Sequence, residues 1–238
     1  MIVAIPDVHT QYEKAQKILD NWDNPANEII FLGDYFDDFN DSVEINVQTA
    51  KWVLSKITDK NKTFLLANHD MSYFVAPARC SGWTCDKQNA LDFFIKDSRT
   101  SLFQFYKLMN IAGQQTLFSH AGLHPHHLPA HFDLKNLDQF LSSQEQAAKG
   151  CMKYDDMHWF YHAGRARGGR YSYGGLTWLD WEDEFEPIEG LSQIVGHTRN
   201  WNVRKKEAKD SVNICLDTHL NNYLTIDENT GETTIYEI

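Results

Sequence analysis

Short apolar runs in this chain are repeatedly followed, within a few residues, by Asp, Asn or His. The runs cover residues 2–5, 29–32, 63–66, 116–118 and 194–195, and the polar segments that follow them are Asp7-Val8-His9, Gly33-Asp34-Tyr35-Phe36-Asp37, Asn68-His69-Asp70, Ser119-His120-Ala121-Gly122 and Gly196-His197-Thr198. Runs of this length that are rich in β-branched and aromatic residues are typical of buried strands. The polar side chains are therefore expected along one edge of a sheet, where open α/β sheets bind ligands.

Segments with helical spacing lie between the first strand-like runs. Residues 12–22 place Ala15, Ile18 and Leu19 on one face, and residues 43–57 show the same period. Ser42 precedes the second segment as a candidate N-cap. The alternation of strands with helices predicts a layered α/β domain.

The residue types at the predicted sheet edge suit a pair of divalent cations. Asp34 is the candidate bridging ligand, because it follows the most hydrophobic run and a glycine that permits a tight turn. Asp7 and His9 alternate along an extended segment, so both can face one ion. The remaining candidate ligands are an amide and two imidazoles, Asn68, His120 and His197.

Two further residues suggest acid catalysis beside the ions. A cation pair can clamp the attacking and leaving oxygens of a phosphoryl group. His69 is next to the candidate ligand Asn68, and its imidazole is free to protonate a leaving oxygen. Asp37 is placed to orient this imidazole and keep it protonated.

The combined pattern resembles the calcineurin-like metallophosphoesterases. Within that family it is most similar to the branch with the serine/threonine phosphoprotein phosphatases and the symmetrical dinucleoside tetraphosphate hydrolases. The segments quoted above match the motifs D-x-H, G-D-x-x-D, G-N-H-[DE], H-[GA]-G and G-H-T, and residues 176–180, 215–218 and 223–227 resemble later segments of the branch. The resemblance implies an α/β fold with four layers, α-β-β-α, in which two mixed sheets carry a dinuclear metal site at one edge.

The chain also departs from this pattern. The protein phosphatases have Arg where this chain has Asp38 and Leu66, so the phosphate must be held by other residues. Ala67 replaces the glycine of G-N-H, and His219 stands where a glycine is expected.

A loop with three arginines, residues 165–170, is the predicted replacement for the missing phosphate ligands. Guanidinium groups suit bidentate phosphate recognition. Arg167 and Arg170 are the preferred pair, Arg199 is a weaker candidate and Arg79 a weaker one still. An ordinary basic surface loop is the alternative interpretation.

Two groups of histidines lie outside the motifs. His124, His126, His127 and His131 are expected in a solvated loop at the pocket rim, although a His-rich tract can bind metal. His158 and His162 are one helical turn apart, and without a third ligand they are interpreted as part of an amphipathic helix rather than a zinc site.

Composition sets the remaining expectations. The 238 residues are expected to form a single domain, with helical inserts near residues 71–110 and 134–162 over the metal edge. The net charge of -11 argues against a nucleic-acid partner. No apolar run is long enough to span a membrane, and no cleavable leader precedes Ile2, so a cytoplasmic location is expected. The four cysteines lack metal-site spacing and are expected to be free thiols.

The predicted function is hydrolysis of phosphomonoesters by a dinuclear enzyme similar to the serine/threonine protein phosphatases. Mn²⁺ is the expected metal, with iron or zinc as alternatives. A nucleotide or dinucleoside polyphosphate hydrolase is the alternative, because Tyr171, Tyr173 and Trp83 are candidates for stacking on a base. An inactive scaffold is disfavoured, since every expected ligand and the acid His69 are present.

Overall fold

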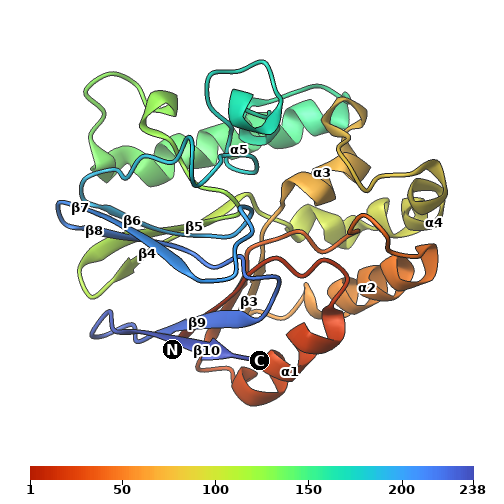
Figure 1. The fold of residues 1–238 in the computed structure, drawn as a ribbon, viewed down its shortest axis with the longest axis horizontal. Coiled ribbons are helices and arrows are strands. Elements are labelled where there is room, and N and C mark those ends of the chain that lie inside the picture. The colour runs from red at the N-terminus through yellow and green to blue at the C-terminus, as the bar shows by residue number, and fades with distance from the viewer.

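The computed structural model describes residues 1–238 and contains two five-stranded mixed sheets, stacked as layers (Figure 1). The first sheet has the order β10-β9-β1-β2-β3, with the bounds Thr233–Glu237, Asn222–Ile226, Ile2–Ile5, Glu28–Phe31 and Lys62–Phe64. β1, β2 and β3 run parallel to one another, and β9 runs antiparallel to β1.

The second sheet has the order β4-β5-β6-β8-β7. Its strands span Tyr106–Ile111, Gln114–Ser119, Leu191–Val195, Ser211–Cys215 and Arg204–Ala208. β5, β6 and β8 are parallel, whereas β4 and β7 pair antiparallel at the two edges. The carboxyl ends of three parallel strands in each sheet therefore point the same way within that sheet.

Alternation along the strands divides the core into two parts. In β1, Ile2 and Ala4 belong to a cluster that also contains Phe118 and Ile194 of the second sheet, so these residues fill the space between the sheets. Val3 belongs to the larger cluster that contains residues of the helices. β1 is apolar throughout because both of its faces are buried.

Helices cover the outer faces of both sheets. The helices are α1 (Tyr12–Trp22), α2 (Val43–Lys56), α3 (Asn68–Phe74), α4 (Cys85–Ile95) and α5 (Leu137–Lys153). Figure 1 shows α5 above the sheet of β4 to β6 and α1 and α2 on the opposite side of the molecule. The predicted four-layer α-β-β-α architecture is confirmed. Ser42 accepts a hydrogen bond from the Ile45 amide at 3.3 Å, which confirms it as the N-cap of α2.

The expectation of a helical insert near residues 71–110 is wrong for its last part, residues 101–110. A short 3₁₀ segment, Ser98–Leu102, is followed by strand β4, which pairs with β5 along its whole length. The turn between them has positive φ at both Ala112 (50°) and Gly113 (86°), as in a type I′ hairpin. An edge strand of a hairpin has apolar residues on one face only, and that partial pattern resembled helical spacing.

The helical expectation for residues 158–162 is also wrong, and the insert near residues 134–162 is helical only in part. α5 ends at Lys153, and Trp159–Tyr161 form a single 3₁₀ turn. Nδ1 of His158 accepts a hydrogen bond from the Phe160 amide at 3.2 Å and caps this turn. Phe160 and Tyr161 are buried, so the apolar residues reflect packing of a turn against the core.

Three smaller features complete the description. The basic residues Arg204–Lys206 lie in the β7–β8 hairpin. All four cysteines are free thiols. No helix combines the length and the hydrophobicity that a membrane crossing requires.

Candidate metal centre

The loops after β1 and β2 run side by side beyond the sheet. The His9 amide donates to the Asp34 carbonyl at 2.6 Å, and the Thr10 amide donates to the Tyr35 carbonyl at 3.1 Å. His9 (φ 39°) and Asp34 (φ 51°) both have the left-handed backbone that is uncommon outside glycine. These turns aim both side chains at the sheet edge.

The glycine before Asp34 is required by both conformation and space. Gly33 has a φ of 108°, and a Cβ at this position would lie 2.5 Å from the Cβ of Ala67. Ala67 itself has an ordinary extended backbone, with a φ of -125°. The methyl group of Ala67 therefore fits where the family pattern has glycine, provided that residue 33 remains glycine.

Ligand atoms from both sheets converge on Asp34. One group comprises His9, Asp34 and His69, and a second comprises Asp34, His120 and His197, with all ligand atoms of a group within 4.8 Å of one another. Oδ2 of Asp34 lies 3.4 Å from Nε2 of His9 and 3.5 Å from Nε2 of His120. Asp34 is the one residue shared by both groups, as a bridging ligand would be.

Hydrogen bonds set the orientation of two of these imidazoles. Nδ1 of His9 donates to the Asp37 carbonyl at 2.8 Å, and Nδ1 of His120 donates to the Leu32 carbonyl at 2.9 Å. A neutral imidazole that donates from Nδ1 keeps its lone pair on Nε2. Both Nε2 atoms face Asp34, so both lone pairs are available to a cation.

The charge balance of the site fits bound cations. Burial raises the pKa of Asp34 well above its ordinary value, and the charge of Asp7 adds to this shift. Burial also lowers the pKa of His9 to about 4 and the pKa of His197 well below its ordinary value. Oδ2 of Asp7 and Nε2 of His197 are buried without a hydrogen-bond partner. Neutral imidazoles around buried carboxylates provide the donor set of a divalent cation site.

Asp7 and Asn68 lie at the same edge but are engaged differently. Oδ1 of Asp7 accepts a hydrogen bond from the His197 amide at 2.9 Å, which links β1 to the loop after β6. Oδ1 of Asn68, at the start of α3, lies 2.9 Å from Nε2 of His120. Asp7 belongs to neither of the two ligand groups described above, whereas His69, predicted as an acid, belongs to the first.

His69, Asp37 and Tyr73 form a buried chain of hydrogen bonds. Nδ1 of His69 lies 2.5 Å from Oδ1 of Asp37, and the Tyr73 hydroxyl donates to Oδ2 of Asp37 at 2.5 Å. The structure thus brings together His69 and Asp37, as predicted. Tyr73 was missed, although it lies four residues after His69 and so on the same face of α3.

Asp70 is a second residue whose contribution was missed. Its Oδ1 accepts the amides of Tyr35 and Phe36, and its Oδ2 accepts the amides of Asp34 and Ala67, at 2.9–3.3 Å. This single carboxylate therefore fixes the backbone of the Asp34 turn against the start of α3. The sequence signal was its place in the Asn68-His69-Asp70 segment.

Asp217 is a third missed residue. It follows β8, its side chain is buried, and it lines the hollow at the metal centre. Burial raises the pKa of Asp7, and the charge of Asp217 is the next cause of that shift. Its position after a parallel strand of the second sheet repeats the pattern of the other site residues.

The arginines are distributed differently from the sequence prediction. Nε of Arg167 pairs with Asp180 at 2.7 Å, and its Nη2 donates to Oγ1 of Thr198 at 2.9 Å. Nη2 of Arg199 lies 3.7 Å from Oδ2 of Asp38. Arg170 is exposed over the ring of Tyr171, 5.4 Å from its centroid, and does not line the hollow.

The two positions where the protein phosphatases have Arg differ in their surroundings. Asp38 lines the hollow, and its carboxylate lies 3.7 Å from the guanidinium of Arg199 in another loop. The other departure, Leu66, is buried in the core.

The site opens into a hollow of about 280 Å³. Its lining residues are His9, Asp34, Asp38, Phe39, Asn68, His69, Ser81, Arg167, Trp178, His197, Arg199 and Asp217. They come from the loops that follow strands of both sheets, from the start of α3, from the loop before α4 and from the connection before β6. The hollow therefore combines ligand atoms, an acid candidate and two guanidinium groups.

The histidines of residues 124–131 do not line this hollow. The expectation of a solvated loop is wrong for His124, which is buried and stacks on Tyr173 with the ring centroids 3.7 Å apart. His127 stacks on Trp159 at 4.5 Å, and its Nε2 lies 2.8 Å from the Gly174 carbonyl. These rings pack the loop that follows β5 against residues 159–174.

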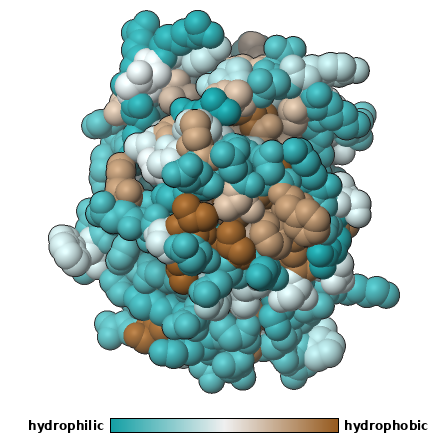
Figure 2. All heavy atoms as spheres, turned by 90° about the vertical axis from the view of Figure 1, so that its right-hand side faces the viewer, coloured by the Kyte–Doolittle hydropathy of each residue, from teal (hydrophilic) through white to brown (hydrophobic).

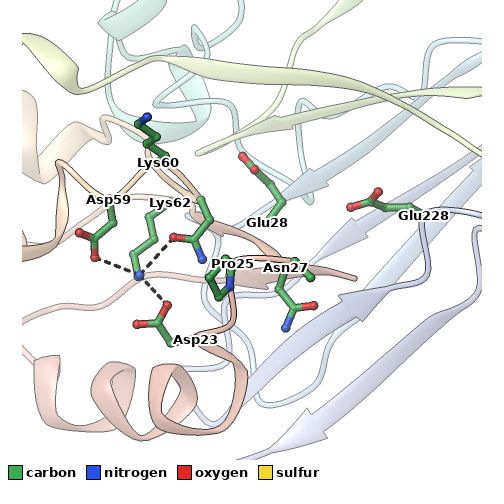
Figure 3. Close-up of a pocket in the computed structure, with 10 residues that line it drawn as sticks. Asp23, Pro25, Asn27, Glu28, Asp59, Lys60, Lys62 and Glu228 are labelled. Atoms are coloured by element: carbon green, nitrogen blue, oxygen red, sulfur yellow. Dashed lines mark hydrogen bonds and ion pairs between the residues drawn. The ribbon is translucent and has the colours of Figure 1, made fainter.

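A separate polar hollow of about 680 Å³ lies at the amino ends of β2 and β3, away from the metal centre (Figure 3). Lys62 lies at its centre, and Nζ contacts Asp23 at 2.7 Å, Asp59 at 3.0 Å and Asn61 at 3.4 Å. The charge of this lysine is fully compensated, so the cluster is a structural ion-pair network.

Comparison with known proteins agrees with the geometry. A family model for calcineurin-like phosphoesterases matches residues 1–200. A cold-active protein-tyrosine phosphatase of a psychrophilic Shewanella species is similar in structure, with a TM-score of 0.57 and 14% identity over 98% of this chain and 79% of that chain. A protein serine/threonine phosphatase from Saccharomyces cerevisiae has a TM-score of 0.57 and 12% identity over 100% of this chain and 79% of that chain. No curated protein sequence matches. The chain belongs to the calcineurin-like phosphoesterase family, whose members are hydrolases of phosphate esters.

Proposed function

We propose that this chain is a metal-dependent phosphomonoesterase with two divalent cations in its site. The observation that carries the proposal is the sharing of Asp34 between two groups of buried ligand atoms, at the floor of a hollow that also contains His69 and Arg167. The proposed ligands are Asp7, His9, Asp34, Asn68, His120 and His197. Asp217 is an additional candidate, because it is buried beside Asp7.

Bound divalent cations would activate a water molecule and neutralise charge on the phosphoryl oxygens. Mn²⁺ is the proposed metal, with iron or zinc as alternatives, since imidazole, carboxylate and amide ligands suit all three. The six ligand residues come from five segments that follow strands of the two sheets, so their relative positions are held by both sheets.

The remaining steps are assigned to side chains of the chain itself. His69 is proposed to donate its proton to the leaving oxygen, while Asp37 holds the imidazole in place through Nδ1 at 2.5 Å. Arg167 and Arg199 are proposed to bind the free phosphoryl oxygens, because both line the hollow. Arg170, preferred on sequence grounds, lies outside the hollow.

A phosphoprotein substrate is proposed from the motif pattern. A nucleotide is the second candidate, and a further hollow beside Arg199, described below, favours it. The intact ligand groups and the intact His69–Asp37 pair argue against an inactive scaffold.

The test compares wild type with Asp34→Asn, using Asp23→Asn as the control. Asp23 is a carboxylate in the distant Lys62 cluster. Wild type should contain about two first-row metal ions per chain after loading with Mn²⁺ and should release phosphate from phosphopeptides or nucleotides. Asp34→Asn should lower both metal content and activity, whereas Asp23→Asn should lower neither. Full activity after exhaustive chelation would disprove the proposal.

A further inference from the structure

A second hollow lies directly beside the metal centre. Its volume is about 610 Å³, and its lining residues are Arg199, Asn200, Trp201, Thr218, His219 and Asn221. Arg199 also lines the hollow of the metal centre, so the two hollows adjoin at this side chain. A group bound in the second hollow could thus be joined to a phosphoryl group at the metal centre.

The turn on one side of this hollow is rigid. His219 (φ 60°) and Leu220 (φ 52°) have left-handed backbone, and the side chain of Leu220 is buried in the core. Oδ1 of Asp217 accepts the His219 amide at 3.0 Å, and Nδ2 of Asn221 donates to the Thr218 carbonyl at 2.7 Å. These contacts hold His219 on the surface of the turn, where its ring is exposed.

The lining of this hollow also includes an aromatic ring without a partner. Trp201 is 92% exposed, the highest exposure among the large hydrophobic residues. Its indole makes no ring contact and no side-chain hydrogen bond within the chain. The apolar faces of an indole are favourable stacking surfaces for another planar ring.

The chemistry of the lining residues indicates which ring would bind. None of the six residues is acidic, and Arg199 contributes a positive charge towards the metal centre. Nδ2 of Asn200 has no partner in the chain, and its Oδ1 accepts only the Asn202 amide at 3.2 Å. Amide groups form hydrogen bonds with both donor and acceptor positions on the edge of a base.

We infer that this hollow, which we call the Trp201 subsite, binds the base of a nucleotide whose phosphate is hydrolysed at the metal centre. The base would stack on Trp201, with His219 and Asn200 at its edges, and Arg199 would lie between base and phosphate. A volume of about 610 Å³ is within the usual range for ligand pockets. The inference rests on the proposed phosphomonoesterase activity and adds a substrate class to it.

The test compares adenosine 5′-monophosphate with ribose 5-phosphate, which has the same ester but no base. In wild type with Mn²⁺, kcat/KM should favour the nucleotide by about tenfold or more, as expected for one stacked base. Trp201→Ala should remove most of this preference, mainly through KM, and Trp201→Phe should restore part of it. An equal kcat/KM for both substrates in wild type would overturn the inference.

Phe93→Ala provides a matched control. Phe93 of α4 is 79% exposed, and α4 lies on the face shown in Figure 2, where an apolar area is surrounded by hydrophilic surface. This variant removes an exposed aromatic ring away from both hollows and should keep the wild-type preference. A similar loss of preference in Phe93→Ala would count against the Trp201 subsite.

A phosphotyrosine peptide tests whether the Trp201 subsite binds a nucleotide base or an aromatic side chain of a peptide. If this peptide, and not the nucleotide, loses kcat/KM in Trp201→Ala, the inferred substrate class is wrong. Hydrolysis of both adenosine 5′-monophosphate and ribose 5-phosphate, with no effect of Trp201→Ala on either substrate, would refute the subsite and leave the proposed activity standing. Failure to hydrolyse any of the three substrates would refute the proposed activity itself.

Discussion

Asp37 has both carboxylate oxygens engaged, one by His69 and one by Tyr73. It is completely buried, and its amide donates to Oδ1 of Asn46 at 2.8 Å. Because these hydrogen bonds fix the carboxylate of Asp37, the imidazole bound to it has little freedom to rotate. The geometry supports the proposed role of His69 as an acid.

His69→Asn should slow hydrolysis by roughly 10²–10⁴ for esters with poor leaving groups, because proton donation is lost. Nitrophenyl phosphate should be affected less, since its leaving oxygen needs little protonation. Turnover of both substrate types, together with metal analysis of the variant, checks this expectation. Loss of bound metal would instead assign His69 to the ligands, a possibility raised by its distance from His9 and Asp34.

Tyr73→Phe should produce a weaker form of the same effect. The change removes the donor to Oδ2 of Asp37 and keeps the aromatic ring in place. We expect a decrease in kcat of about 3- to 30-fold for poor leaving groups, equivalent to about 0.7–2 kcal/mol for one hydrogen bond to a charged group. An equal decrease with nitrophenyl phosphate would indicate a general structural effect and contradict a positioning role.

Arg167→Ala should reduce kcat/KM by about 2–4 kcal/mol of transition-state stabilisation, as expected for a lost charged donor to a phosphoryl oxygen. Arg170→Ala is the control from the same loop and should remain within about twofold of wild type. Arg167→Lys should restore little, because an ammonium group cannot donate two parallel hydrogen bonds. Equal kinetics for Arg167→Ala and Arg170→Ala would remove Arg167 from the substrate site.

At the scale of elements, the β4–β5 hairpin contains local strain. Ala112 has a φ of 50°, a conformation that costs an L-residue about 1–2 kcal/mol, whereas glycine adopts it freely. Ala112→Gly should therefore raise the free energy of unfolding by about 0.5–1 kcal/mol after the entropy cost of glycine is included. Urea unfolding measures this change. Ala130→Gly, on an exposed loop, is a control that should not be stabilised.

At the scale of the whole molecule, the Lys62 cluster joins the end of α1 to the connection between α2 and β3. The lysine side chain is 2% exposed, while both carboxylate partners are 40% exposed. Lys62→Met should lower the free energy of unfolding by about 1–3 kcal/mol, less than for a fully buried pair because the carboxylates remain hydrated.

The effect of Lys62→Met should depend on pH. The hydrogen bond from Lys62 lowers the pKa of Asp23 below its ordinary value. A carboxylate with a lowered pKa stabilises the fold above its unfolded pKa and loses this contribution as the pH falls through the folded value. The difference between wild type and variant should be constant above about pH 5 and shrink below about pH 4. A difference that persists at low pH would show that packing, and not charge, is lost.

The sequence by itself determined the layered α/β class and the order of the site residues. Each ligand segment directly follows a buried strand, and parallel strands place such segments at one edge whatever the packing of the helices. The bounds of α1 also follow from the local sequence, because its apolar residues recur with the helical period.

Only the tertiary structure decided which polar residues face one another across the two sheets. Three contacts join distant segments. Asp38 pairs with Arg199, and Asp217 is buried beside Asp7. The carboxylate of Asp70 accepts amides both from the Asp34 turn and from the start of α3. Such contacts cannot be predicted from the local sequence, because they form only when separate loops meet at the sheet edge. Residues 106–109 illustrate the same limit, since their pairing with β5 outweighed an apparent helical period.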